Sequence, residues 1–270
     1  MSDTPRLTDL NALTRNRARA SETFLQREAR AEVEDRLALV NRRFTQAAVV
    51  SGFPQVWAEV VPGARMVQET ELLDLQEGAH DLVVHALGLH WSGDPVGQLI
   101  QCRRALRPDG LLLAGLLGGN TLHELRTCLS EAEVRVTGGL SPRVAPMAEI
   151  RDLGGLLQRA GAALPVADTV PLDIRYKSAL HLMRDLRAMG EANALEARLR
   201  RPTRRAVLLE AARIYEENYP HPEGGIRATF EMIFLSGWAP DGTQPQPLRP
   251  GSATKRLSEA LGTEEIPLGD

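Results

Sequence analysis

The chain has 270 residues, of which 43% are hydrophobic, and this is enough to bury one sizeable core. Its formal net charge of −3 gives no global preference for nucleic acid or for an anionic membrane surface. The start MSDTPRLTDL lacks a signal pattern, and the longest apolar run, 111–117, is far below the ~20 residues of a membrane helix. We therefore expect a soluble, cytoplasmic protein without a transmembrane segment, for which peripheral association with a membrane stays open.

The pattern of the sequence divides the chain into three parts. Residues 1–45 form an amphipathic helical extension, with a long helix expected at 13–40 because apolar residues recur there at helical spacing. Residues 46–239 form an α/β domain that carries a helical insertion at about 176–220. Residues 240–270 are rich in proline, glycine and polar residues, which predicts an extended tail.

Strand and helix patterns alternate along the middle part. Alternation of this kind is typical of a doubly wound, Rossmann-like sheet whose strands are mostly parallel. We expect strands at 47–50, 64–67, 80–87, 111–117, 165–174 and 227–238, and helices at 54–60, 96–106, 121–134, 149–160, 178–189 and 203–219.

An ordered set of motifs resembles the class I S-adenosylmethionine (SAM)-dependent methyltransferase-fold family. Within it, the set is similar to the branch of mitochondrial complex I assembly factor 5 and its alphaproteobacterial relatives. A more distant cousin is the carrier-protein methyltransferase of biotin synthesis. The motifs are LHWSGDP (89–95), LRPDG (106–110), GGNTLHELR (118–126), GGLSPRVAP (138–146), RDLGGLLQRAG (151–161), MRDLRAMGEANAL (183–195) and GSATKRL (251–257).

The resemblance implies a fold, a cofactor and a role. The fold is a parallel seven-stranded sheet with an antiparallel last strand, which would be 227–238, and the cofactor is SAM. The role is the maturation of respiratory complex I, in which an arginine of a complex I subunit is hydroxylated. A protein is thus the implied partner.

The first cofactor-binding unit departs from this family pattern. A methyltransferase of this fold needs glycines after its first strand, because a Cβ would prevent the close approach of the cofactor. Here Ser51 and Gly52 are followed by Phe53 and Pro54, and no acid precedes them. The segment up to residue 75 also looks short by about one strand–helix unit, given the length of such crossovers. We therefore expect a fold that is truncated at this unit.

The second strand of such a fold ends in an acid that binds the ribose hydroxyls. Glu69 or Glu71 is the candidate for that acid, and either is equally well explained as an exposed loop charge. Losing both ribose hydrogen bonds would weaken cofactor binding by a factor of ~100 or more. We therefore expect that SAM does not bind in the usual way.

Further candidates lie at the carboxyl ends of the later strands, where open α/β sheets bind ligands. His85 and Leu87 end one strand and are cofactor-binding candidates, although His85 is also explained as a packed strand residue. His90 and Trp91 follow in the loop and are candidates for a catalytic imidazole and an aromatic wall, with core anchoring as the alternative for Trp91. Arg143 lies in a proline-flanked loop and could meet a carboxylate.

The metal-ligand patterns are weak. A non-haem iron site uses two histidines and a carboxylate. His221 and Glu223 have HxE spacing, but no second histidine is marked as their partner. We expect no metal site, and no mechanism of hydroxylation follows from these residues.

Three functions stay open on the sequence. The main one is a methyltransferase-like protein with a degenerate cofactor site that matures or assembles a complex I subunit. The alternative is an active SAM-dependent methyltransferase of a protein or a small carboxylate, in which Glu69 or Glu71 replaces the missing acid. The third is a scaffold without a small ligand.

Overall fold

A computed structural model describes residues 6–245 and 262–263 of the chain. Residues up to 240 belong to one compact unit, and those from 241 onward belong to a second one. The tail expected at 240–270 and the GSATKRL motif lie mostly or wholly outside the described residues. The account below concerns the first unit.

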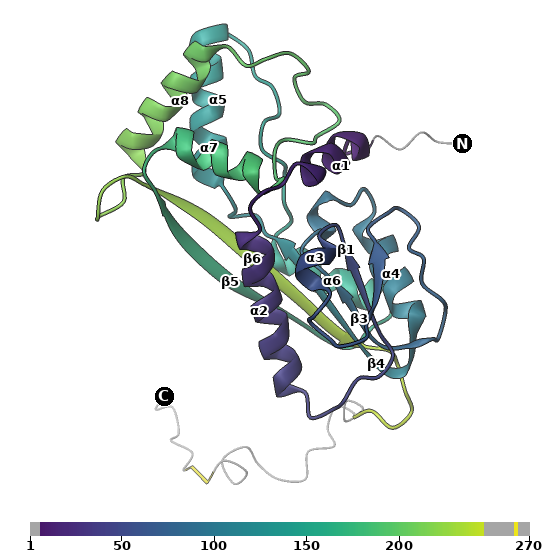
Figure 1. Cartoon of the computed structure of the whole chain (residues 1–270). Helices are drawn as coiled ribbons and strands as arrows, with labels where there is room; N and C mark the ends of the chain where they lie inside the picture. The colour runs from purple at the N-terminus through teal and green to yellow at the C-terminus, as the bar shows by residue number, and fades with distance from the viewer. Residues whose placement is uncertain (1–5, 246–261, 264–270) are drawn as a thin grey trace, which may run out of the picture. The chain divides into compact units, whose positions relative to one another are not determined.

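The centre of this unit is a six-stranded sheet with the order β2-β1-β3-β4-β6-β5 (Figure 1). Neighbouring strands from β2 to β4 are parallel, whereas β6 is antiparallel to both β4 and β5. The antiparallel last strand is therefore confirmed. The described residues form six strands rather than the seven that the resemblance implies. The strands are β1 (Ala47–Ser51), β2 (Arg65–Gln68), β3 (His80–His85), β4 (Leu106–Leu117), β5 (Ala163–Tyr176) and β6 (Ile226–Trp238).

Helices cover both faces of the sheet, as expected for a doubly wound fold. Alternate residues of a strand point to opposite faces, and in β1 Val49 packs into one core cluster while Ala48 and Val50 pack into another. The first cluster lies under α2, α5, α7 and α8, and the second under α4 and α6. The helices are α1 (Leu10–Ala18), α2 (Phe24–Leu39), α3 (Pro54–Trp57), α4 (Pro95–Ala105), α5 (His123–Thr137), α6 (Ile150–Arg159), α7 (Ala179–Ala188) and α8 (Arg205–Asn218), with a short 3₁₀ helix η1 at Leu89–Trp91.

A small helix connects β1 to β2. Parallel strands normally need a crossover of a dozen or more residues, usually with a full helix. Here the connection contains only α3, which has four residues and starts at Pro54. Phe53 and Trp57 are 1% and 0% exposed, so this small helix is held by its aromatic side chains in the core.

The single helix predicted at 13–40 is wrong, because the structure has two helices there. The helix α1 ends at Ala18 and α2 begins at Phe24. Between them, the backbone N–H groups of Ser21 and Glu22 both donate to the carbonyl oxygen of Ala188 at the end of α7. Tertiary hydrogen bonds therefore break a helical pattern that continues in the sequence.

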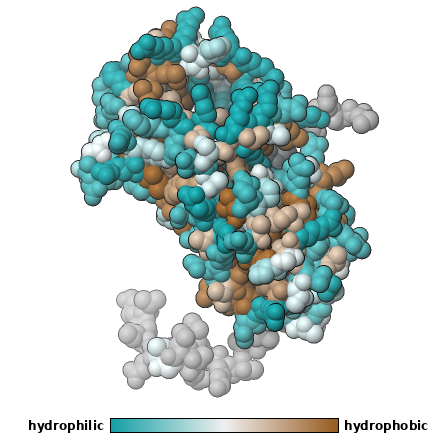
Figure 2. All heavy atoms as spheres, in the orientation of Figure 1, coloured by the Kyte–Doolittle hydropathy of each residue, from teal (hydrophilic) through white to brown (hydrophobic). Residues whose placement is uncertain are grey.

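The surface of the described part of the chain is of mixed hydropathy. On the face seen in Figure 2, most surface residues are hydrophilic and apolar residues form patches between them. Among the described residues, none of the helices is both long and apolar enough to span a membrane.

A buried glutamine ties α2 to the end of the sheet. Gln26 is 4% exposed, donates to the carbonyl oxygen of Leu87 over 3.1 Å and accepts from the indole N–H of Trp57 over 2.8 Å. This one side chain satisfies two buried polar groups from segments that flank the expected cofactor site.

Replacing Gln26 with leucine leaves the Trp57 N–H and the Leu87 carbonyl without partners. Each such group costs about 1–3 kcal/mol, so we expect the free energy of unfolding to fall by about 2–6 kcal/mol in denaturant titrations. The matched control is Gln158→Leu at an exposed position of α6, which should change stability by less than about 0.5 kcal/mol. Equal losses in the two variants would contradict the bridging role.

Candidate functional site

The sheet topology brings the predicted cofactor-binding segments together at one edge. Parallel pairing of β1 with β3 sets Val50 opposite His85, and the backbone N–H of Ala86 donates to the carbonyl oxygen of Val50. Ser51 and Gly52 therefore leave the sheet beside Leu87. This is the edge at which open α/β sheets bind ligands.

An ion pair of the chain itself occupies this edge. The guanidinium of Arg17, from α1, lies 2.8 Å from the carboxylate of Glu69, and the two side chains are only 9% and 13% exposed. A Cβ built on Gly52 would lie 2.9 Å from Cζ of Arg17, and one built on Gly88 would lie 2.7 Å from the carboxyl carbon of Glu69. The close approach that glycine allows a ligand is therefore used by these two side chains.

Glu69 has the topological position of a ribose-binding acid. It follows β2 directly, and β2 pairs with β1 at the same edge. Its carboxylate, however, is directed at Arg17 and packs against Gly88. The position predicted from the sequence thus exists, but one oxygen of the acid, Oε2, already accepts a hydrogen bond from Arg17.

Side chains of the protein itself cover the main chain at this edge. The guanidinium of Arg17 lies against Gly52, and its Cζ lies 5.6 Å from the centre of the Phe53 ring. A cavity of about 610 Å³ lies beside Arg17 and is also lined by Ser51, Gly52, Gln68 and Glu69. A ligand in this cavity would meet Arg17 before it reached the main chain at Gly52.

The other two cofactor candidates are packed in the protein. His85 is 1% exposed, and its ring nitrogens lie 3.2 Å from the carbonyl oxygen of Ala86 and 3.4 Å from Oε1 of Gln98. Leu87 is 3% exposed, and its carbonyl accepts from Gln26.

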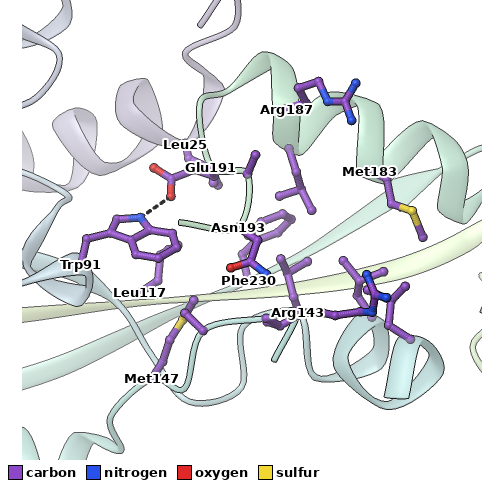
Figure 3. A pocket seen from close by; sticks show the side chains of 17 residues that line it. Leu25, Trp91, Leu117, Arg143, Met147, Met183, Arg187, Glu191, Asn193 and Phe230 are labelled. Carbon is purple, nitrogen blue, oxygen red and sulfur yellow. Dashed lines mark hydrogen bonds between the residues drawn. The ribbon is translucent and has the colours of Figure 1, made fainter. Parts of the chain in front are cut away.

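A separate cavity of about 180 Å³ is lined by two of the three catalytic candidates (Figure 3). Trp91 and Arg143 both line it, while His90 lies beside it with 8% exposure. Its walls are mostly apolar side chains from β4, α5, α7 and β6. The apolar wall residues include Leu117, Leu122, Leu125, Met147, Met183 and Phe230.

The polar end of this cavity is Glu191, which the sequence did not single out. Oε2 of Glu191 accepts from the indole N–H of Trp91 over 2.7 Å, and Nε2 of His90 lies 3.6 Å away (Figure 3). Burial raises the pKa of Glu191, but His90, Arg17 and Trp91 lower it by more, so the pKa lies below its ordinary value. The carboxylate is therefore ionised at neutral pH. The sequence signal for Glu191 was its position within the motif MRDLRAMGEANAL.

Arg143 serves the chain's own structure. Its guanidinium donates two hydrogen bonds to Glu133 of α5, at 2.9 and 2.6 Å, and a third to the hydroxyl of Thr203. The backbone N–H and hydroxyl of Ser141 also donate to Glu133. The carboxylate that the sequence expected Arg143 to meet is thus present within the protein, and the pair fastens the loop after α5.

Metal-ligand groups do not cluster in the described part of the chain. No set of three or more histidine, cysteine, aspartate or glutamate side chains there is arranged to hold a metal ion. The ring of His221 instead accepts from the backbone N–H of Glu223 over 3.1 Å, within a turn.

Comparison with known proteins adds sequence relatives. No protein-family model matches the chain. It is 37% identical over 199 residues to the Danio rerio protein named arginine-hydroxylase NDUFAF5, mitochondrial. The aligned residues cover 74% of this chain and 62% of the relative. The Homo sapiens protein of the same name is 37% identical over 202 residues, covering 74% and 57%. A malonyl-[acyl-carrier protein] O-methyltransferase of Methylovorus is 32% identical over 193 residues, covering 69% and 62%.

Solved structures of similar shape are more distant. The Bacillus subtilis YcgJ protein is 11% identical with a TM-score of 0.49, covering 80% of this chain and 99% of its own. The chain spans less than two thirds of the length of the curated relatives named above.

The sheet with helices on both faces and these relatives define the class of the protein. The chain has the fold of the class I SAM-dependent methyltransferases. Its sequence relatives include the proteins named arginine-hydroxylase NDUFAF5, at 37–40% identity, which confirms the resemblance that the motifs indicated.

The buried pair of Arg17 and Glu69 gives a first test of the site. Glu69→Ala leaves a buried guanidinium without its carboxylate, which should lower the free energy of unfolding by about 3–5 kcal/mol. The control is Glu217→Ala, which removes an exposed partner of Arg213 on α8 and should cost less than about 1 kcal/mol. Chemical denaturation measures both, and a loss for Glu69→Ala no larger than the control would exclude a buried ion pair.

The pair of Glu133 and Arg143 gives a test by pH. Hydrogen bonds from Arg143 hold the pKa of Glu133 below its ordinary value of 4.5, despite burial. This stabilisation is fully present above pH 4.5 and is lost as the pH falls through the lower folded pKa. Unfolding free energies measured from about pH 6 to about pH 3 should fall more steeply for the wild type than for Glu133→Gln. Parallel curves would contradict the lowered pKa.

Proposed function

We propose that this protein matures or assembles a subunit of respiratory complex I by acting on an arginine side chain of that subunit, with a cofactor site that no longer takes SAM in the usual way. The names of the relatives support arginine as the target, and the resemblance of the motifs supports complex I. Because the chain spans only part of the relatives' length, activity, substrate and partner are all part of this proposal.

One observation carries the proposal about the cofactor: the side chains of Arg17 and Glu69 fill the space against Gly52 and Gly88. Hydroxylation of an arginine needs an oxidant, which we do not assign to any residue of the chain. To the described residues we assign the binding and orientation of the substrate side chain and its shielding from water. The partner is thus a protein, and neither the fold nor the net charge favours nucleic acid.

The cytoplasmic location expected from the sequence stays a proposal. The relatives carry the word mitochondrial in their names, which is said of them alone.

An active methyltransferase is the second candidate, because one observation favours it. Glu69 stands at the end of the strand beside β1, where a ribose-binding acid belongs. SAM could use this acid only after Arg17 had left it. The variant Arg17→Ala therefore distinguishes the two functions experimentally.

Isothermal titration with SAM tests the cofactor proposal. We expect no saturable binding to the wild type up to about 1 mM, which corresponds to a binding free energy weaker than about −4 kcal/mol. A micromolar dissociation constant at one site of the wild type would contradict the proposal and favour the methyltransferase. Micromolar binding by Arg17→Ala alone would locate the block in Arg17 rather than in Phe53 and Pro54.

Deletion of the gene in its source organism tests the role in complex I. We expect a lower level of assembled complex I and of its NADH-oxidising activity, both restored by the wild-type gene on a plasmid. Normal complex I in a clean deletion strain would overturn the proposed function.

A further inference from the structure

The cavity beside Trp91 contains an electrostatic imbalance. Leucine and phenylalanine side chains form its walls, while Glu191 presents a carboxylate whose side chain is only 8% exposed. A buried charge of this kind is costly unless it is paired. The charges within reach of it therefore decide which ligand fits.

Two carboxylates lie around one guanidinium here. Arg17 is paired with Glu69, and its charge also lowers the pKa of Glu191. His90 approaches Glu191 with its Nε2 at 3.6 Å, while its Nδ1 accepts from the backbone N–H of Leu117 over 3.4 Å.

The other basic side chains of the cavity do not neutralise Glu191. Arg143 is bound to Glu133 through two hydrogen bonds. Arg187 is exposed at the rim, where solvent screens its charge. In Figure 3 its guanidinium extends away from the carboxylate of Glu191.

The free oxygen of Glu191 and the shape of the cavity specify the ligand. The hydrogen bond from Trp91 and the close approach of His90 both involve Oε2, which leaves Oε1 for a ligand. An indole lies beside it, and a planar guanidinium can stack on an indole while it donates to a carboxylate. The apolar walls suit the aliphatic stem of the same side chain.

We propose that this cavity receives the side chain of an arginine residue of a partner protein, with Glu191 as the acceptor of its guanidinium and Trp91 as the residue that positions Glu191. The inference rests on the proposed function, because it assigns the substrate side chain of that function to a place in the fold. It also separates two regions of the edge: the position of the lost cofactor is filled by Arg17 and Glu69, and the substrate cavity lies beyond Trp91.

Calorimetric titration with peptides tests the site directly. The probe is the pentapeptide Gly-Gly-Arg-Gly-Gly, and the comparison peptides carry citrulline, which is neutral, or lysine in place of arginine. We expect saturable binding of the arginine peptide, at least about tenfold weaker binding of both comparison peptides, and a tenfold to hundredfold weaker binding to Glu191→Gln. Free arginine, used as a further probe, should bind more weakly than the peptide.

The matched control is Glu196→Gln, five residues along the same segment, where the carboxylate is exposed and paired with Arg200. This variant should bind the arginine peptide as the wild type does. A thermal melt of Glu191→Gln within a few degrees of the wild type excludes unfolding as the cause of lost binding. If the variant melts lower, Trp91→Phe, which keeps the aromatic wall and removes the N–H, replaces it in the comparison.

Several results would overturn the assignment. These are equal binding of the arginine and citrulline peptides, equal binding of the lysine peptide, unchanged binding to Glu191→Gln, and no saturable binding up to the solubility limit. Complementation of the deletion strain separates this failure from that of the proposed function. If the wild-type gene restores complex I and Glu191→Gln restores it equally, the inference alone fails. If deletion leaves complex I unchanged, the proposed function fails. The peptide titration then still tests whether the cavity binds an arginine side chain.

Discussion

The ion pair between Arg17 and Glu69 sets the character of this site. It joins an amino-terminal helix to the end of the edge strand β2, at a depth where both side chains are almost removed from solvent. A pair in such a place is costly to break from one side only, so the two elements remain together. It also uses the open backbone at Gly52 and Gly88, which a methyl donor would otherwise approach. The fold of a methyltransferase is thus retained while Arg17 and Glu69 cover the main chain at its usual ligand position.

The same helix connects the closed edge to the second cavity. Asn16 donates to the carbonyl oxygen of Ala192, Asp9 pairs with Arg198, and Gly190, with a φ of +79°, approaches the backbone of Arg17. The segment that carries Glu191 is therefore fixed against the helix that carries Arg17. A change that loosens α1 should affect both regions, because they share these contacts.

Much of the fold could be predicted from the sequence, since it depends on local patterns. The apolar run at 111–117 belongs to a buried central strand, and the short segment after Gly52 indicates one strand–helix unit fewer. The break between α1 and α2 could not be predicted, because it depends on hydrogen bonds to Ala188, far away in the chain. Intrinsic helix propensity predicts a helix, but hydrogen bonds from the backbone to a distant part of the chain can override it.

The site was less predictable for the same reason. The loss of glycines around Gly52 was visible, but not that Arg17 takes the vacated space, since charged residues of an amphipathic helix usually face water. Glu191 lies within the motif at 183–195, but its contacts with Trp91 and His90, which lie about a hundred residues earlier, could not be predicted from that motif. Arg143, a candidate site residue, pairs with Glu133 of the same chain, and nothing in the sequence indicated this partner.

The most direct measurement is a crystal structure of the protein grown in a large excess of SAM. The account predicts that the guanidinium of Arg17 stays bound to Glu69 against Gly52 and that electron density for the methyl donor is missing from this edge. A well-ordered SAM molecule whose ribose is held by Glu69, with Arg17 displaced, would contradict it.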